Sequence, residues 1–230
     1  YNFVSAPVLK SAANINGGIK VTWLDTNTTA KKFYVYRKAA AETKWTRVGT
    51  TTTTSFVDKN VVNGTKYTYT VRAASDTNLS DFNKTGVSTL YIETPALKKI
   101  SIAKNGDVTI NWGAVAGAKG YYVYKSVNGS AWTRIASITN PKTVSYKDTT
   151  AKKSGETYSY TVRAINGSYA SYYVTSGIST MFLAAPTVNV KNDYTVEEGS
   201  SVKVSWNSIP GAKSYKIYRK TADATTWTAI

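Results

Sequence analysis

The chain contains no histidine and no cysteine, and these two absences restrict the chemistry available to it. Histidine is the side chain most often used for acid–base and metal chemistry near neutral pH, and cysteine supplies a thiolate nucleophile. Without cysteine, no disulfide stabilises the fold, and thiol usage does not indicate a redox compartment. We therefore expect neither a cofactor nor a bound metal.

Acidic residues are also few, with 13 Asp and Glu against 29 Lys and Arg. Only Glu197 and Glu198 are adjacent carboxylates, and neighbouring residues of a strand point to opposite faces. A glycosidase needs two carboxylates roughly 5 to 9 Å apart across a cleft. Asp76 and Asp81 fall short of the six to eight oxygens, approximately, that calcium prefers. The sequence therefore predicts no enzyme.

The excess of basic residues gives a formal net charge of +16, which favours association with polyanions. Nucleic acid, anionic cell-wall polymers and acidic glycans are all polyanions, and charge alone does not choose among them. Lysine pairs such as Lys31-Lys32 and Lys98-Lys99 are typical of loops and protected sheet edges. Because the aromatic and glycine pattern of an RNA-binding sheet is missing, we expect no nucleic-acid partner.

Long apolar runs are missing as well. No stretch of about 18 apolar residues occurs, so the sequence predicts no membrane insertion. The N-terminus has neither Met nor a signal-like apolar segment, and we therefore expect Tyr1 to follow a processing or excision site. The absence of cysteine fits secreted proteins that fold without oxidation.

The sequence does contain a tandem repeat. The motif YTYTVRA at 67–73 returns as YSYTVRA at 158–164, an offset of 91 residues. The motifs IKVTWL, VTINWG and VKVSWN place Trp23, Trp112 and Trp206 at offsets of 89 and 94 residues. These offsets exceed a solenoid repeat and match a whole small domain.

Each repeat has the alternation of half-buried strands. Ile19, Val21 and Trp23 share one face of a predicted strand, and Lys20 and Thr22 share the other. Asn-Gly pairs, which are typical of tight turns, separate such segments. They occur at 16–17, 63–64, 105–106, 128–129 and 166–167. About seven short strands per repeat predict a β-sandwich.

Family features occur at equivalent places in the units. Pro7, Pro95 and Pro186 open the first predicted strand, a Trp lies in the second, and GTKYTYTVRA or GETYSYTVRA forms the sixth. In these features the units resemble bacterial fibronectin type III domains. The resemblance implies a tyrosine corner, in which the hydroxyls of Tyr67 and Tyr158 would bond back to the preceding chain.

We therefore predict an all-β protein of tandem immunoglobulin-like (fibronectin type III) β-sandwiches in an extended rod. The predicted modules are 1–93, 94–184 and 185–230, the last being strands A, B, C and C′ of an incomplete module. No Gly/Ser tether separates them, which restricts bending. Because half a sandwich leaves Trp206 without an opposing layer, we expect the natural protein to continue beyond Ile230, or another chain to complete the module.

Outward-facing aromatic and arginine side chains form a first candidate surface. They are Tyr36, Trp45 and Arg72 in the first module, and Tyr124, Trp132 and Arg163 in the second. A ladder of these side chains would gain about 0.5 to 2 kcal/mol per cation–π contact. One interpretation is a flat platform for sugar rings. Recurrence in every module favours the other interpretation, a structural ladder, alongside the core residues Trp23, Trp112, Trp206, Tyr67 and Tyr158.

The predicted FG loops differ between modules and form a second candidate. SDTNLSDFNKT at 75–85 is replaced by NGSYASYYVTS at 166–176, which offers Tyr169, Tyr172 and Tyr173. Tyrosine is enriched at binding surfaces, so these three residues are candidate binding residues. They are equally suited to packing on the next domain.

Together these features predict a non-enzymatic spacer or presentation segment of a larger bacterial extracellular or wall-attached protein. A secondary role would be adhesion to a protein, a glycan or an anionic cell-wall polymer. One alternative is a carbohydrate-binding accessory of a glycoside hydrolase. Another is a surface assembly subunit whose last module is completed in trans. The sequence gives no oligomeric state.

Overall fold

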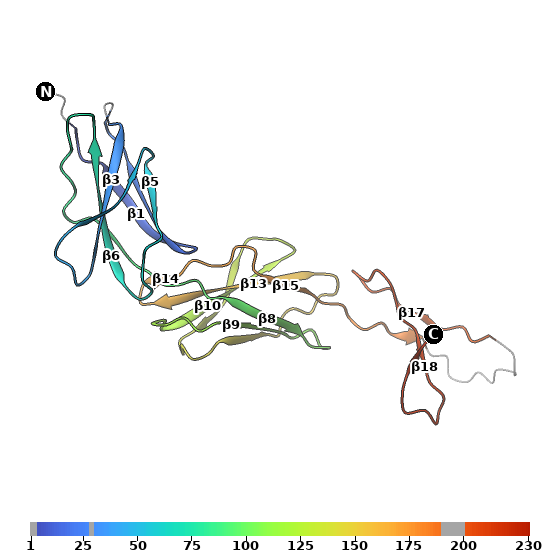
Figure 1. Cartoon of the computed structure of the whole chain (residues 1–230). Coiled ribbons are helices and arrows are strands. Elements are labelled where there is room, and N and C mark those ends of the chain that lie inside the picture. The colour runs from blue at the N-terminus through green and yellow to red at the C-terminus, as the bar shows by residue number, and fades with distance from the viewer. Residues whose placement is uncertain (1–3, 28–29, 190–200) are drawn as a thin grey trace.

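The computed structural model describes residues 4–27, 30–189 and 201–230. Every helix or strand assigned in these ranges is a β-strand. In the same ranges, no helix has the length and apolar character needed to cross a membrane. Two sandwiches and a third, smaller group of strands follow one another along the chain (Figure 1). The prediction of an all-β protein of tandem sandwiches is confirmed.

The first sandwich consists of a three-stranded and a four-stranded antiparallel sheet. The three-stranded sheet comprises, in spatial order, β1 (Val8–Ile15), β2 (Gly18–Leu24) and β5 (Ser55–Asp58). The four-stranded sheet comprises β4 (Thr46–Thr51), β3 (Lys32–Ala39), β6 (Lys66–Ala74) and β7 (Val87–Leu90). This arrangement of seven strands is that of a fibronectin type III sandwich.

The second sandwich repeats this order and adds one short strand. Its three-stranded sheet comprises β12 (Ser145–Asp148), β9 (Val108–Trp112) and β8 (Leu97–Ile102). Its other sheet comprises β11 (Thr133–Ile138), β10 (Gly120–Val127), β13 (Thr157–Asn166), β14 (Tyr169–Ala170) and β15 (Ile178–Met181). Both β14 and β15 pair with β13.

The alternation in the sequence produces these sheets. In β9, Val108, Ile110 and Trp112 are buried, while Thr109 and Asn111 are only partly buried. Glycine has a positive φ in each of the five Asn-Gly pairs, as tight turns require.

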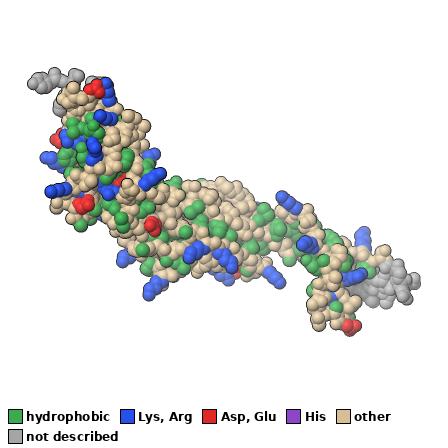
Figure 2. All heavy atoms as spheres, viewed as in Figure 1, with side chains coloured by type: hydrophobic (Ala, Val, Ile, Leu, Met, Phe, Trp, Pro, Cys, Tyr) green, Lys and Arg blue, Asp and Glu red, His purple; other side chains and the backbone are tan. Residues whose placement is uncertain are grey.

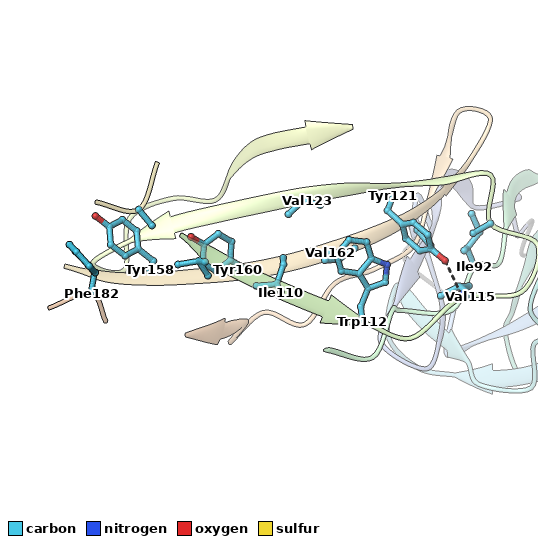
Figure 3. Close-up of a cluster of buried hydrophobic side chains, with 14 residues drawn as sticks. Ile92, Ile110, Trp112, Val115, Tyr121, Val123, Tyr158, Tyr160, Val162 and Phe182 are labelled. Carbon is cyan, nitrogen blue, oxygen red and sulfur yellow. Dashed lines mark hydrogen bonds between the residues drawn. The ribbon is translucent and has the colours of Figure 1, made fainter. Parts of the chain in front are cut away.

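Each sandwich has its own hydrophobic core. In the second, the Trp112 and Tyr121 rings meet edge to face with centroids 5.4 Å apart. Figure 3 shows these two rings at one end of the core and Tyr158 at the other, between strands of the two sheets. Trp23 and Phe33 meet in the same way, also at 5.4 Å, in the first core. The two cores therefore have the same central aromatic pair.

Adjacent residues of the first linker enter different cores. Tyr91 belongs to the first core and Ile92 to the second, although both precede the predicted boundary at 93. The boundaries at 93 and 184 remain predictions. The chain therefore passes from one core to the next between two consecutive residues.

The described part of 185–230 forms two short strand pairs rather than a closed sandwich. The pairs are β16 (Val188–Asn189) with β17 (Ser205–Trp206), and β18 (Tyr218–Arg219) with β19 (Thr228–Ala229). Trp206 and Tyr215 lie 5.4 Å apart, as the core pair of the second module does. Their apolar face borders an open hollow of about 600 Å³, and Trp227 at its edge is 63% exposed.

Candidate functional site

In each of the two sandwiches, the outer face of the larger sheet carries an aromatic cleft. In the first module it is lined by the predicted ladder residues Tyr36, Trp45 and Arg72, together with Thr70 and Phe82. Its volume is about 60 Å³. The structure therefore brings the three predicted residues together, and adds a phenylalanine from the loop between β6 and β7.

Trp45 lies one residue before β4, so it occupies the end of the sheet edge rather than the strand itself. Its indole covers Gly86, where an added Cβ atom would lie 3.2 Å from the ring. Phe82 meets the indole edge to face with centroids 6.1 Å apart, and the Lys38 ammonium lies 4.9 Å from its centroid. Phe82 therefore fills the cleft from the loop side.

Arg72 makes a different contact from the one the ladder predicts. Its Nε–H donates to the Ser80 carbonyl at 2.6 Å, and the guanidinium carbon lies 5.9 Å from the Phe82 ring centroid. The hydrogen bond directs the guanidinium to the loop, so its ring partner is Phe82 rather than Trp45. The alternation of residues along the strand placed Arg72 on the outer face of the sheet, as observed, but did not identify Phe82 as its partner.

The second module has the equivalent cleft, with a volume of about 210 Å³. It is lined by Tyr124, Trp132, Thr161, Arg163 and Tyr173. The Arg163 Nε–H donates to the Ser171 carbonyl at 2.7 Å, and its guanidinium carbon lies 5.9 Å from the Tyr173 ring centroid. The cleft architecture is thus repeated, but its volume is not.

One aromatic contact accounts for the larger volume. Tyr173 stacks on Tyr172 with centroids 5.1 Å apart and an interplanar angle of 27°. In the first module the residue before Phe82 is Asp81, which offers no ring, and Phe82 packs against Trp45 instead. The stack on Tyr172 therefore holds Tyr173 in a way that leaves the space beside Trp132 open.

The two loops share a serine hydrogen bond to the strand despite their different sequences. Buried Ser80 and Ser171 accept hydrogen bonds at Oγ from the N–H groups of Ala73 and Ala164, at 2.8 and 2.9 Å. These two serines were not identified from the sequence as residues that hold the loop to the strand. An alignment of the repeats could have identified them, because the two serines align at the same offset of 91 residues as the preceding strand. The aligned segments are SDFNKTG and SYYVTSG.

The three predicted binding tyrosines occupy different places. Tyr172 and Tyr173 form the stacked pair at the cleft, whereas Tyr169 lies on β14 and packs against the second core. The neighbouring Ala170 carbonyl accepts a hydrogen bond from Asn14 Nδ2 of the first module at 3.0 Å. This loop therefore meets the preceding module.

The predicted corner tyrosines lie at the opposite end of the sandwiches. The Tyr67 hydroxyl accepts a hydrogen bond from the Val62 N–H at 3.0 Å. The Tyr158 hydroxyl accepts one from the Lys153 N–H at 3.1 Å and donates to Glu156 Oε2 at 2.9 Å. Both hydroxyls thus contact the chain just before their own strand.

A buried carboxylate accompanies each corner. Asp148 Oδ2 accepts hydrogen bonds from Lys125 Nζ at 3.0 Å and Tyr160 Oη at 2.8 Å. Burial tends to raise the pKa of this carboxyl, but hydrogen bonds from Thr150, Lys125 and Tyr160 outweigh it and lower the pKa. Burial and the nearby carboxylate raise the pKa of Tyr160. The network keeps Asp148 charged and Tyr160 neutral.

The first module has the corresponding network. Asp58 Oδ2 accepts hydrogen bonds from Arg37 at 2.8 Å and from Tyr69 at 3.0 Å. Burial and Asp58 raise the pKa of Tyr69. Because both carboxylates lie among framework residues below the corners, they are part of the fold rather than of the cleft.

The other predicted residues have simpler positions. Trp23 and Trp112 are buried at the centre of the two cores, and Trp206 is partly buried in the third group of strands. Asp76 forms an exposed ion pair with Lys31. Glu197 and Glu198 lie outside the described residues. Within the described ranges, no cluster of three or more acidic side chains is arranged to hold a metal ion.

Comparison with known proteins gives one curated relative and several solved structures. No family model matches it. It is similar to Exoglucanase B of Cellulomonas fimi, with 33% identity over 222 residues that cover 85% of this chain and 19% of that protein.

Two solved structures are similar to part of the chain. Domains FN1–FN3 of chicken CNTN1 are 18% identical with a TM-score of 0.41, over 78% of this chain and 67% of that one. A segment of two fibronectin type III domains of chicken tenascin is 13% identical with a TM-score of 0.35, over 77% and 99%. By its own strand order the chain is a tandem array of fibronectin type III-like sandwiches, and it spans less than a fifth of the exoglucanase that it resembles.

Proposed function

We propose that this chain is a non-enzymatic spacer that holds other parts of a larger bacterial, extracellular or wall-attached protein at a fixed separation. The single observation that carries the proposal is a hydrogen-bonded junction that occurs twice in the chain. Neighbouring domains move relative to one another by default, and contacts that attach the linker to both modules restrict that motion.

At the first junction Asn63 bonds to both neighbouring segments. Its Nδ2 donates to the Ala116 carbonyl of the second module at 2.8 Å, and its Oδ1 accepts from the Glu93 N–H of the linker at 3.0 Å. The Tyr91 carbonyl accepts from the Gly64 N–H at 2.8 Å. The linker is therefore attached to the loop it passes.

At the second junction Ser154 takes the place of Asn63. Its hydroxyl donates to the Pro210 carbonyl at 3.1 Å and accepts from the Ala184 N–H at 3.1 Å. The Phe182 carbonyl accepts from the Gly155 N–H at 2.9 Å. Each linker is therefore held by one side chain that bonds to the next module and to a linker N–H, and by a glycine N–H that bonds to a linker carbonyl. The first junction also has the hydrogen bond from Asn14 to the Ala170 carbonyl. These contacts support a defined arrangement of neighbouring modules.

The charge of the chain supports adhesion to anionic wall or glycan surfaces as a secondary role. The visible face in Figure 2 carries more Lys and Arg than Asp and Glu side chains along the first two modules, in keeping with the net charge of +16. A positive surface attracts polyanions through its long-range field, and salt weakens this attraction. Attachment by this route would be insensitive to sugar identity.

Distance measurements between modules test the spacer. Because the chain has no cysteine, spin labels at Thr52→Cys and Lys142→Cys report one distance between the first two modules. The same experiment with Lys142→Cys and Lys213→Cys reports the second junction. We expect a narrow distribution of distances in both experiments. A broad distribution at both junctions would refute a fixed separation.

A second candidate function is that of a carbohydrate-binding accessory to a glycoside hydrolase. The similarity to a protein named Exoglucanase B favours it, as does the open aromatic cleft of the second module. In this role the chain would bring a polysaccharide near a catalytic domain elsewhere in the protein. Glycan binding that survives high salt would support this role over attachment by charge alone.

A further inference from the structure

We infer that the cleft between Trp132 and Tyr173 is a binding site for one pyranose ring of a polysaccharide. The inference deepens the second candidate function and does not depend on the spacer role. A pyranose has a flat face of C–H groups and a rim of hydroxyls, so it fits a site with aromatic walls and polar tips.

The cleft has the apolar walls that such a ring needs. Trp132, Tyr124 and Tyr173 supply three aromatic rings, and all three are partly buried rather than enclosed. Tyr173 is held by its stack on Tyr172, and Trp132 rests against Gly177. Aromatic side chains that are fixed before binding lose little conformational freedom when a ligand arrives.

The polar tips around these walls are available. Within the described residues, no hydrogen bond involves the Tyr124 or Tyr173 hydroxyl or the Trp132 indole N–H. Arg163 is bonded there only through Nε, to the Ser171 carbonyl. Its two Nη groups therefore remain as donors beside the cleft. Such groups can orient a sugar by its hydroxyls or by a carboxylate.

The size of the cleft limits the ligand. A volume of about 210 Å³ lies below the roughly 300 to 1,000 Å³ of pockets that enclose drug-sized molecules. The cleft also opens on the outer face of the sheet, so a polysaccharide can pass across it and place one ring inside. A site of this kind suits a long polymer better than a free monosaccharide.

The first module provides an internal comparison. Its cleft has the same framework, yet Phe82 packs against Trp45 and leaves about 60 Å³. This smaller cleft, filled by Phe82, is sufficient for a purely structural role. With Tyr172 and Tyr173 in place of Asp81 and Phe82, the second cleft is open, while the hydrogen bond between the loop serine and the strand is kept. At the cleft itself, the modules therefore differ in the residue that faces the tryptophan, Phe82 in the first and Tyr173 in the second.

The test uses cellohexaose as a neutral glucan and an oligogalacturonate as an acidic glycan, with the complete chain. We expect at least one of them to bind, measured by calorimetry and by indole fluorescence. Cellohexaose binding that persists at high salt would identify a neutral polymer. Preference for oligogalacturonate that weakens with salt would identify an acidic one. Absence of binding by either glycan would overturn the inference.

Two variants locate the site. Trp132→Ala is expected to lower affinity about tenfold or more, the effect of losing one well-stacked ring. The double variant Tyr172→Asp with Tyr173→Phe copies the first module and is expected to fill the cleft. It should abolish binding while the melting temperature stays close to that of the parent, because the first module folds with the same pair.

The matched control is Trp45→Ala, which removes the equivalent indole from the filled cleft of the first module. We expect it to leave glycan affinity unchanged even though it destabilises its own module. If the double variant binds the glycan as tightly as the parent, the glycan binds elsewhere, and the assignment of the site to this cleft is contradicted. That result would leave the distance measurements on the spacer unaffected.

Discussion

Trp132 combines a structural and a proposed binding role, whereas its equivalent Trp45 has the structural role alone. Trp45 and Trp132 both close the edge of a sheet by covering a glycine with a positive φ, Gly86 or Gly177. Recurrence alone therefore does not distinguish a framework residue from a ligand-binding one. What separates the two clefts is the residue that faces the tryptophan, Phe82 in one module and Tyr173 in the other.

Trp45→Ala should destabilise the first module by about 2 kcal/mol. The indole is partly buried and contacts Gly86, Phe82 and Lys38, so the loss should be below the roughly 3 to 5 kcal/mol of a fully buried Trp. Thermal or urea unfolding of the first module, produced alone or within the chain, measures the change. An unchanged melting temperature would show that the indole contributes no packing.

The second module should lose stability in acid through Asp148. Its pKa is lowered in the folded state from an ordinary value of 3.8, so folding favours the charged form. The contribution is fully present above the unfolded pKa, and it is lost as the pH falls below that value through the folded pKa. We expect the melting temperature to fall more steeply below about pH 4 than above it.

Asp148→Asn provides the control for this acid dependence. Lys125 and Tyr160 lose their charged acceptor, so the variant should melt at a lower temperature at neutral pH. Its remaining change in melting temperature between neutral and acid pH should be smaller than in the parent. Equal acid dependence in the two proteins would assign the effect to other carboxylates.

At the scale of elements, the strands were predictable and the loop geometry was not. Alternation along 19–23 and 108–112 places the core residues correctly because a strand has only two faces. The loop between β13 and β15 depends on Ser171, whose two hydrogen bonds to backbone give no periodic signal. Phe82 was not predicted for the same reason, since the alternation that assigns strand residues to one face or the other does not apply in a loop.

The sequence predicted which residues line the cleft on the sheet, but not the volume of the cleft. Parity puts Tyr124 and Arg163 on the outer face, as the structure has them. The volume of the cleft depends on whether the Tyr173 ring packs against Tyr172 or against Trp132. These two aromatic contacts are of similar strength. Sequence alone does not decide between contacts that differ by less than about 1 kcal/mol.

Gly177→Ala should disturb the cleft through the indole. Gly177 has a φ of 64°, and an added Cβ would lie 2.7 Å from both the Trp132 ring and the Tyr160 carbonyl oxygen. The expected loss of stability is about 2 to 4 kcal/mol, from strain and displacement of the ring. Unfolding experiments and indole fluorescence measure both effects.

Gly167→Ala is the matched control for this substitution. Gly167 also has a positive φ, 59°, but no atom lies within 4 Å of an added Cβ. Only the backbone preference should act, with a loss of about 1 kcal/mol and unchanged indole fluorescence. Similar losses in the two variants would mean that contact with Trp132 does not restrain position 177.

At the scale of the whole molecule, the repeat extends beyond the sandwiches to their junctions. Asn63 and Ser154 differ chemically, yet each donates to a carbonyl of the next module and accepts from a linker N–H. An amide does this with two atoms and a hydroxyl with one. Either side chain can therefore attach the linker to the next module, although the residue types at 63 and 154 differ.

This equivalence makes a prediction about the first junction. Asn63→Ala removes the hydrogen bonds to Ala116 and Glu93, so the distribution of distances between labels in the two modules should broaden. Asn63→Ser should keep it narrow, because Ser154 makes the same two bonds at the second junction with a hydroxyl. Spin-label distance measurements on the parent and the two variants provide the comparison. If Asn63→Ala keeps the parent's distribution, the side chain at 63 is not needed to hold the modules, and the remaining contacts of the junction are sufficient. These are the packing of Tyr91 and Ile92 into their separate cores and the hydrogen bond from Asn14 to the Ala170 carbonyl.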